Sequence, residues 1–205
     1  MFENSVSPAV TLDFGFTMKQ ARTLTEKQLK MVLAHCATRR HAARDRAIIA
    51  VSHLAGLRAK EIAALTLGNV MNDERTVRSE FVLAPSQTKG AKSRRVFVST
   101  KLRKELEQYL SQARLRRNCP YLFQSQKGSA FSPNTMCQLI IGIYEECGLE
   151  GATSHSGRRS LITNLANKGI SIKILAEIAG HSSIQNTARY ISVNDDLMRA
   201  AVELV

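Results

Sequence analysis

The chain has 205 residues, a length typical of one domain, and 44% of them are hydrophobic, which is enough for a sizeable core. Lysine and arginine number 29 against 17 aspartate and glutamate residues, so the formal net charge is +12. This excess favours a polyanionic partner such as nucleic acid. A membrane protein is disfavoured because no apolar run approaches the ~18 residues of a spanning helix, and the amino terminus lacks the pattern of a secretory signal.

The four cysteines carry no metal-binding or disulfide pattern. None forms a C-x-x-C pair, and no histidine lies at zinc-finger spacing from two of them. They are interpreted as thiols in a reducing cytoplasm. The phosphate-binding sequence G-x-x-x-x-G-K-[ST] is also absent, which argues against a nucleotide-driven motor. The sequence therefore predicts neither a metal ion nor a cofactor.

The first part of the chain is predicted to be helical after an irregular start. Residues 1–22 show no clear periodicity and are interpreted as an arm or lead-in. Thr25 and Gln28 then fit a capping box, and apolar residues follow at helical spacing. Further helices are predicted over residues 44–54 and 59–67.

The hydrophobic period then changes. Residues 76–83 and 94–99 alternate as strands around a polar loop, which indicates a hairpin or small antiparallel sheet. We expect Ser171 to cap a later helix and Gly180 to end it. The fold class is therefore mainly α with a small antiparallel β-sheet, an α+β fold. The later helices are predicted over residues 101–115, 133–147, 155–168, 171–180 and 183–191, with an amphipathic tail helix over 195–205.

Arginines, histidines and a tyrosine supply the parts needed to break a phosphodiester without a metal ion. Attack on phosphorus builds negative charge on the non-bridging oxygens, which many enzymes neutralise with a metal held by carboxylates. This sequence shows no obvious acidic cluster and offers Arg58 and Arg158, whose planar forks can grip phosphate oxygens. His155 precedes Arg158 by three residues, so both could lie on one helix face.

The remaining parts are a nucleophile, a base and an acid. Tyr190 supplies a phenol, whose ordinary pKa of about 10 means that it needs a base or strongly positive surroundings to attack. His155 and His181 are the candidates to assist it. The leaving 5′ oxygen needs a proton, which Lys89 in the loop between the strands could supply, with Lys92 as the alternative.

Together these residues resemble the tyrosine recombinase, or phage integrase, family. The family pattern has an arginine in G-L-R-x-x-E-(I/L), a lysine on a β-hairpin, H-x-x-R, G-H, and a tyrosine nine residues after that histidine. Gly157 departs from it, because leucine is more often found there. The pattern is matched here, over residues 23–205, by Arg58, Lys89, His155, Arg158, His181 and Tyr190.

The resemblance implies a fold and an activity. It implies the tyrosine recombinase catalytic-domain fold over residues 23–205, and a DNA strand transferase that performs integration, excision or inversion, as in a mobile genetic element. Tyr190 would be the nucleophile and would form a 3′-phosphotyrosyl link. Lys89 would protonate the leaving oxygen.

The same resemblance implies roles for the other four residues. Arg58 and Arg158 would bind the scissile phosphate. His155 would assist proton transfer to and from the tyrosine, and His181 would hydrogen-bond the phosphate. Losing one such preorganised donor typically lowers a rate by about 10²–10³-fold.

The amino-terminal side differs from most of the family, whose members carry a separate helical core-binding domain. Only 22 residues precede the domain here, so the chain resembles the short single-domain members or a catalytic fragment; Met1 favours the short protein. The expected partners are double-stranded DNA, further copies of the chain (a dimer on a site, a tetramer in synapsis) and an accessory DNA-bending or core-binding protein. The expected location is the cytoplasm, at the nucleoid when bound to DNA.

Two other functions stay open on the sequence alone. One is a type IB topoisomerase-like enzyme that cleaves, relaxes and reseals DNA, and the other is a catalytically silent DNA-binding regulator. The amphipathic tail over 195–205 favours a recombinase, since members of that family dock such a tail onto a neighbouring subunit. The DNA backbone is expected to contact basic clusters at Arg39, Arg40, Arg44, Arg46 and in residues 89–117.

Overall fold

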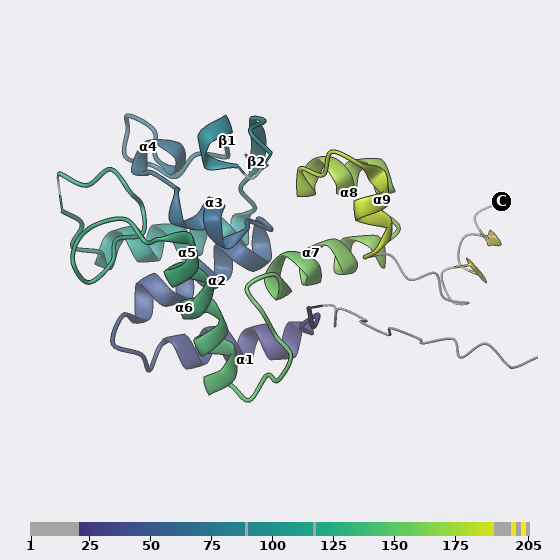
Figure 1. Ribbon diagram of the computed structural model, residues 1–205, viewed down its shortest axis with the longest axis horizontal. Coiled ribbons are helices and arrows are strands. Elements are labelled where there is room, and N and C mark those ends of the chain that lie inside the picture. Colours follow the sequence, from purple (N-terminus) through teal and green to yellow (C-terminus); the bar gives the residue numbers. More distant parts are fainter. Residues whose placement is uncertain (1–20, 89, 117, 191–197, 200–201, 204–205) are drawn as a thin grey trace, which may run out of the picture.

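The computed structural model describes residues 21–205 except 89, 117, 191–197, 200–201 and 204–205. Most of the predicted lead-in (1–22) and most of the predicted tail helix (195–205) therefore lie outside the described residues. The described chain is mostly helical with one two-stranded antiparallel sheet, which confirms the predicted fold class (Figure 1). None of the described helices is long and apolar enough to cross a membrane.

The elements follow the predicted order, with most helix ends within three residues of the predicted ones. Figure 1 places α7, α8 and α9 on one side of the molecule and α4, α5 and α6 on the other, with α1 along the bottom of the view. The elements are α1 (Glu26–Cys36), α2 (Ala42–Leu54), α3 (Ala59–Ala63), α4 (Leu67–Val70), β1 (Glu80–Leu83), the 3₁₀ turn η1 (Pro85–Gln87), β2 (Arg94–Phe97), α5 (Thr100–Gln112), α6 (Pro133–Glu146), α7 (Ser156–Ala166), α8 (Ile172–Ala179) and α9 (Ile184–Ala188).

Helix α2 forms the centre of the main core. Its residues from Ala47 to His53 are buried, and it packs against α1, α5 and α7. His53 is held in this core by a hydrogen bond between its Nε2 and the hydroxyl of Tyr144 on α6 (3.0 Å). Helix α1 begins with the predicted capping box, in which Gln28 N–H donates to Thr25 Oγ1 (3.2 Å) and Thr25 N–H donates to Gln28 Oε1 (3.0 Å).

The predicted helix over 59–67 is wrong in one respect, because two short helices replace it. Ala64 ends α3, and the extended backbone of Thr66 starts α4, with Asn69 N–H donating to Thr66 Oγ1 (3.2 Å). Between them Leu65 is completely buried. The break therefore lets Leu65 enter the core while a second N-cap satisfies the new helix end.

The sheet is shorter than the two predicted strands. β1 and β2 pair in the register Glu80↔Phe97 to Leu83↔Arg94. Phe81, Leu83 and Val96 face the core, whereas Val82 and Phe97 are exposed. Alternation along each strand thus places one face of the hairpin on the core and leaves the other to solvent.

Helices α8 and α9 close the described fold around a small second core. Its buried residues are Ile162 and Ala166 of α7 with Leu175 and Ala179 of α8. Gly180 ends α8 in the left-handed conformation (φ 58°), as predicted. Ser171 takes the predicted cap position without a side-chain hydrogen bond, and Tyr190 lies just beyond α9 rather than within a helix over 183–191.

The departure from the family pattern at Gly157 has a packing reason that can be tested. A Cβ there would overlap Ser52 Oγ on α2 and lie 2.9 Å from His53 Cδ2. Gly157→Ala is therefore expected to lower the free energy of unfolding by about 1–3 kcal/mol, measured by urea denaturation. The matched control is Gly142→Ala on α6, where a Cβ meets nothing within 4 Å, so it should be neutral or stabilising by about 0.5–1 kcal/mol. Equal effects at the two positions would contradict the close approach of α2 and α7.

Candidate active site

Arg58 is held by a buried carboxylate that the sequence analysis did not single out. Arg58 precedes α3, and its backbone N–H donates to Glu61 Oε2 (2.8 Å) while its Nη1 donates to Glu61 Oε1 (3.0 Å). The Glu61 side chain is 1% exposed and that of Arg58 is 22% exposed. Glu61 thus fixes the guanidinium of Arg58 at the surface of the site, and the signal for it was the i, i+3 spacing of the two residues.

Arg158 lies deeper, at the first turn of α7. It is 2% exposed and donates from Nη1 to the carbonyl of Gly56 (2.8 Å) and from Nη2 to the carbonyl of Ala179. Gly56 has φ 63°, and a Cβ on it would lie 2.9 Å from Leu161 Cδ2, so the close approach of α7 requires glycine. The end of α2 and the end of α8 therefore meet at one guanidinium.

A third arginine, Arg94, joins this cluster from β2. It is 7% exposed, its Nη1 donates to the carbonyl of Ala179 (2.9 Å), and its Nη2 lies 3.4 Å from Glu61 Oε2. The sequence analysis missed it, because an arginine beside a strand in a basic loop has no distinguishing pattern. Its position shows that the hairpin contributes a buried cation to the site.

The cluster carries more positive charge than the described residues neutralise. Burial, followed by Arg58 and Arg94, lowers the pKa of Arg158 to about 9, while Glu61 and Tyr190 oppose that shift. Burial also lowers the pKa of Arg94. Three guanidinium groups face one carboxylate, so an anion with up to two negative charges would complete the site. A phosphodiester under attack is such an anion.

His181 and Tyr190 stack beside the arginines. Their ring centroids are 5.7 Å apart and their planes differ by 20°. His181 Nδ1 is 2.9 Å from Thr187 Oγ1, and burial, followed by Arg158, Arg58 and Arg94, lowers its pKa to about 4. His181 is therefore neutral at neutral pH, with its other nitrogen able to bond an incoming group.

Tyr190 is held from two further directions. Its carbonyl accepts from Thr163 Oγ1 on α7 (3.2 Å), and the guanidinium of Arg159 lies 5.4 Å from the centre of its ring. Because Tyr190 also acts on the pKa of Arg158, the phenol lies within electrostatic reach of the arginine cluster. The structure thus brings Arg58, Arg158, His181 and Tyr190 together.

Two predicted residues remain, His155 and Lys89. His155 is exposed and precedes the first residue of α7, with its backbone N–H donating to Thr153 Oγ1 (3.2 Å). Arg158, in the first turn of the helix, is buried. Lys89 lies outside the described residues.

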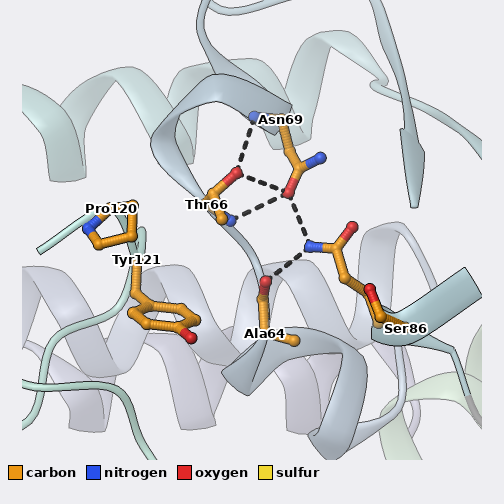
Figure 2. Close-up of a pocket in the computed structure, with 7 residues that line it drawn as sticks. Ala64, Thr66, Asn69, Ser86, Pro120 and Tyr121 are labelled. Carbon is orange, nitrogen blue, oxygen red and sulfur yellow. Dashed lines mark hydrogen bonds between the residues drawn. The ribbon is translucent and has the colours of Figure 1, made fainter. Parts of the chain in front are cut away.

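The loop that contains Lys89 is anchored on both sides of it. The Gln87 side chain donates to the carbonyl of Ala64 (2.6 Å) and to Asn69 Oδ1 (2.9 Å). Figure 2 shows these bonds crossing a pocket of about 390 Å³ between the α3–α4 junction and η1. Thr88, directly before Lys89, donates from Oγ1 to the carbonyl of Lys92, which follows it (2.9 Å). These bonds fix the ends of a short loop whose lysine is the candidate acid.

The chemistry of the cluster suits anion binding without a metal. Among the residues that the structure describes, no three His, Cys, Asp or Glu side chains form a group that could hold a metal ion. Residues 22–196 match the model of the phage integrase family. The chain belongs to the phage integrase family.

Tyrosine recombinases are similar to this integrase-family chain in sequence and in structure. Tyrosine recombinase XerA of Pyrococcus horikoshii is 30% identical over 185 residues, which are 89% of this chain and 60% of XerA. A crystal structure of XerA recombinase has a TM-score of 0.71 at 25% identity and covers 90% of this chain and 66% of that one. The XerH recombinase bound to a palindromic difH substrate, in a post-cleavage complex, has a TM-score of 0.69 at 23% identity over 88% of this chain and 51% of XerH. The chain thus spans about 60% of the length of the curated XerA relative.

The depressed histidine pKa values give this integrase-family domain a testable pH dependence. The pKa of buried His53 and that of His181 are both lowered from 6.5 to about 4. As the pH falls below ~6.5, these two histidines become protonated in the unfolded chain but stay neutral in the folded chain. The free energy of unfolding is therefore highest above this pH and decreases progressively down to ~4. Melting temperatures at about pH 7 and about pH 5 should show the loss, and His181→Gln should make it smaller. An unchanged pH dependence in His181→Gln would contradict a neutral, enclosed His181.

Proposed function

We propose that this chain is the catalytic part of a site-specific DNA recombinase that cleaves and rejoins DNA through a covalent 3′-phosphotyrosyl intermediate. The observation that carries the proposal is the under-neutralised arginine cluster beside the stacked His181 and Tyr190. Such a cluster suits the extra negative charge of a five-coordinate phosphorus, and the tyrosine beside it supplies the nucleophile.

In the proposed reaction, Tyr190 Oη attacks the scissile phosphorus as the bond from phosphorus to the 5′ oxygen breaks. His155 takes the phenol proton and Lys89 gives a proton to the leaving 5′ oxygen, so the proton count balances. The product is a phosphotyrosyl ester with a free 5′ hydroxyl. Because the ester retains the energy of the phosphodiester, a second 5′ hydroxyl can rejoin the strand in the reverse reaction without ATP.

The other site residues stabilise charge. Arg58, the most exposed of the three arginines, and Arg158 would bind the non-bridging oxygens. The neutral His181 would donate a hydrogen bond from the ring nitrogen that Thr187 leaves available. Glu61 would keep Arg58 in a fixed orientation, so that little reorganisation is needed when charge develops.

Replacement of the nucleophile tests the proposal directly. Tyr190→Phe is expected to form no covalent adduct on a nicked suicide duplex drawn from DNA that flanks the gene, because no hydroxyl remains to attack phosphorus. DNA binding should persist, since the arginine cluster is intact, and gel-shift titration of the same variant provides the control. Adduct formation by Tyr190→Phe would rule out this residue as the nucleophile.

A basic groove offers the DNA backbone a second contact. It encloses about 590 Å³ at the amino end of α2, and no carboxylate lines it. The backbone of Arg116 is clamped there, because its N–H donates to Gln124 Oε1 (3.0 Å) and its carbonyl accepts from Gln124 Nε2 (3.3 Å). The four arginines that line the groove are Arg40, Arg44, Arg114 and Arg116.

The groove replaces part of the basic cluster that the sequence suggested. Arg39 lies 2.9 Å from Asp45 Oδ2, and Arg46 lies 2.6 Å from Glu105 Oε1. Both side chains are therefore occupied within the chain, and so is that of Arg44, which lies 2.9 Å from Asp45 Oδ1. We assign the phosphate contacts to the other groove arginines, Arg40, Arg114 and Arg116. Since α2 has 13 residues, the groove lies about 20 Å along this helix from the end that contacts Arg158.

Removal of two groove arginines should weaken DNA binding in a salt-dependent way. For the double variant Arg114→Gln and Arg116→Gln, the slope of log affinity against log salt should fall by about 2, because each phosphate contact contributes roughly 0.9. The rate of adduct formation at saturating DNA should be unchanged. The control is Lys27→Gln with Lys30→Gln, which removes the same charge from exposed positions of α1. Equal slopes for the two double variants would contradict a backbone contact in the groove.

Recombination and topoisomerase activity differ in what happens after cleavage. The similarity to the XerA and XerH recombinases favours a recombinase. We also propose that copies of the chain assemble on DNA, since Ile170, Ile174 and Ile184 are exposed apolar residues at and beside α8 and α9. Strand exchange between two paired sites would support the recombinase, whereas relaxation of a plasmid without any site would identify a topoisomerase.

A further inference from the structure

Arg94 is a buried cation that the proposed chemistry does not use. It is the first residue of β2, and its partner across the sheet is Leu83 at the end of β1. It is 7% exposed, although its neighbour Arg95 has a side chain that is 63% exposed. One arginine of the pair therefore points into the protein beneath the active site while the other faces solvent.

The hydrogen bonds of Arg94 are incomplete. Nη1 donates to Ala179 O, but Nε and Nη2 are enclosed and have no hydrogen-bond partner among the described residues. Glu61 lies 3.4 Å from Nη2 and is shared with Arg58. A buried cation with unsatisfied donors is weak evidence for stabilisation, since apolar residues of similar size often do as well or better. Arg94 is thus better explained by what it holds in place.

The group that Arg94 holds is the carboxyl end of α8. Ala179 O accepts from both Arg94 and Arg158, and the next two residues are Gly180 and His181. The stem of Arg94 also lies against Gly180, where a Cβ would overlap Arg94 Cδ and lie 3.3 Å from Cγ. Arg94 therefore fixes the backbone two residues before His181.

This connection matters because α8 is otherwise attached through a small apolar contact. The second core contains four buried residues and is separate from the main core. A cluster of this size leaves α8 less firmly fixed than the helices of the main core. Hydrogen bonds from β2 and α7 to Ala179 add a polar link at the end that leads to the site.

We propose that Arg94 is a positioning residue: by donating to Ala179 O it fixes His181 in its stacked position on Tyr190. In this way the β1–β2 hairpin, which carries Arg94, is coupled to the nucleophile. The inference rests on the proposed strand-transfer function.

The first test measures His181 in the free full-length chain and needs no activity. The charged groups that act on His181 are Arg158, Arg58 and Arg94, and Tyr190 stacks on it. Arg94→Met keeps the stem but removes the charge and the donors. We expect the ring-proton shifts of His181 to change as the stacking loosens. The His181 pKa, followed by NMR of the imidazole nitrogens, should rise above about 4, chiefly because a displaced ring is less buried and to a smaller extent because the Arg94 charge is gone.

Two further variants separate geometry from charge. Arg94→Lys keeps the charge but loses the forked guanidinium, so the ring shifts of His181 should change as in Arg94→Met while its pKa rises less. Arg95→Met removes the same charge from the exposed neighbour on β2 and should leave both quantities at their wild-type values. Wild-type His181 shifts and pKa in Arg94→Met would overturn the proposal.

The second test measures adduct formation at saturating DNA. Arg94→Met should form the adduct about 10²-fold more slowly, the loss expected for a displaced catalytic group, with DNA affinity changed by no more than a few-fold. Its melting temperature should stay close to the wild-type value, because Glu61 keeps Arg58 as a partner, and this separates positioning from simple unfolding. A wild-type rate in Arg94→Met would also overturn the proposal. If the wild-type chain itself forms no adduct, the proposed function fails, and the NMR measurement still decides the role of Arg94.

Discussion

The carboxylate of Glu61 and the carbonyl of Ala179 are the two acceptors around which three arginines are arranged. Glu61 binds Arg58 and approaches Arg94, while Ala179 accepts from Arg94 and Arg158. One negative charge among three positive ones leaves the site with a net positive charge that a bound anion would balance. Burial of the imidazole, followed by the positive charge of the three arginines, lowers the pKa of His181 and so keeps it a neutral hydrogen-bonding group.

This arrangement also determines where the backbone must come close. Gly56 and Gly180 both have positive φ angles and both lie against arginine or core side chains of the site. Gly157 lets α7 approach α2 where a side chain would overlap Ser52. Three glycines thus allow the ends of α2, α7 and α8 to converge on one pair of guanidinium groups.

Much of the fold was predictable because the local signals were strong. The capping box at Thr25, the alternation of the hairpin and the glycine after α8 all act within a few residues, and the structure confirms each. The helix over 59–67 was predicted wrongly, since burial of Leu65 and the cap at Thr66 override the helical pattern. Tyr190 lies past α9 because a hydrogen bond from Thr163 on α7, distant in sequence, holds its backbone.

The sequence by itself determined the family and the set of candidate catalytic residues, because their order and spacing form a pattern that few other proteins share. Only the tertiary structure decided which of them meet, and which unrecognised groups support them. Arg94 and Glu61 carry no distinctive spacing relative to each other, since they lie on β2 and α3. The charge of the site depends on contacts between distant segments, and such contacts arise only when the helices pack.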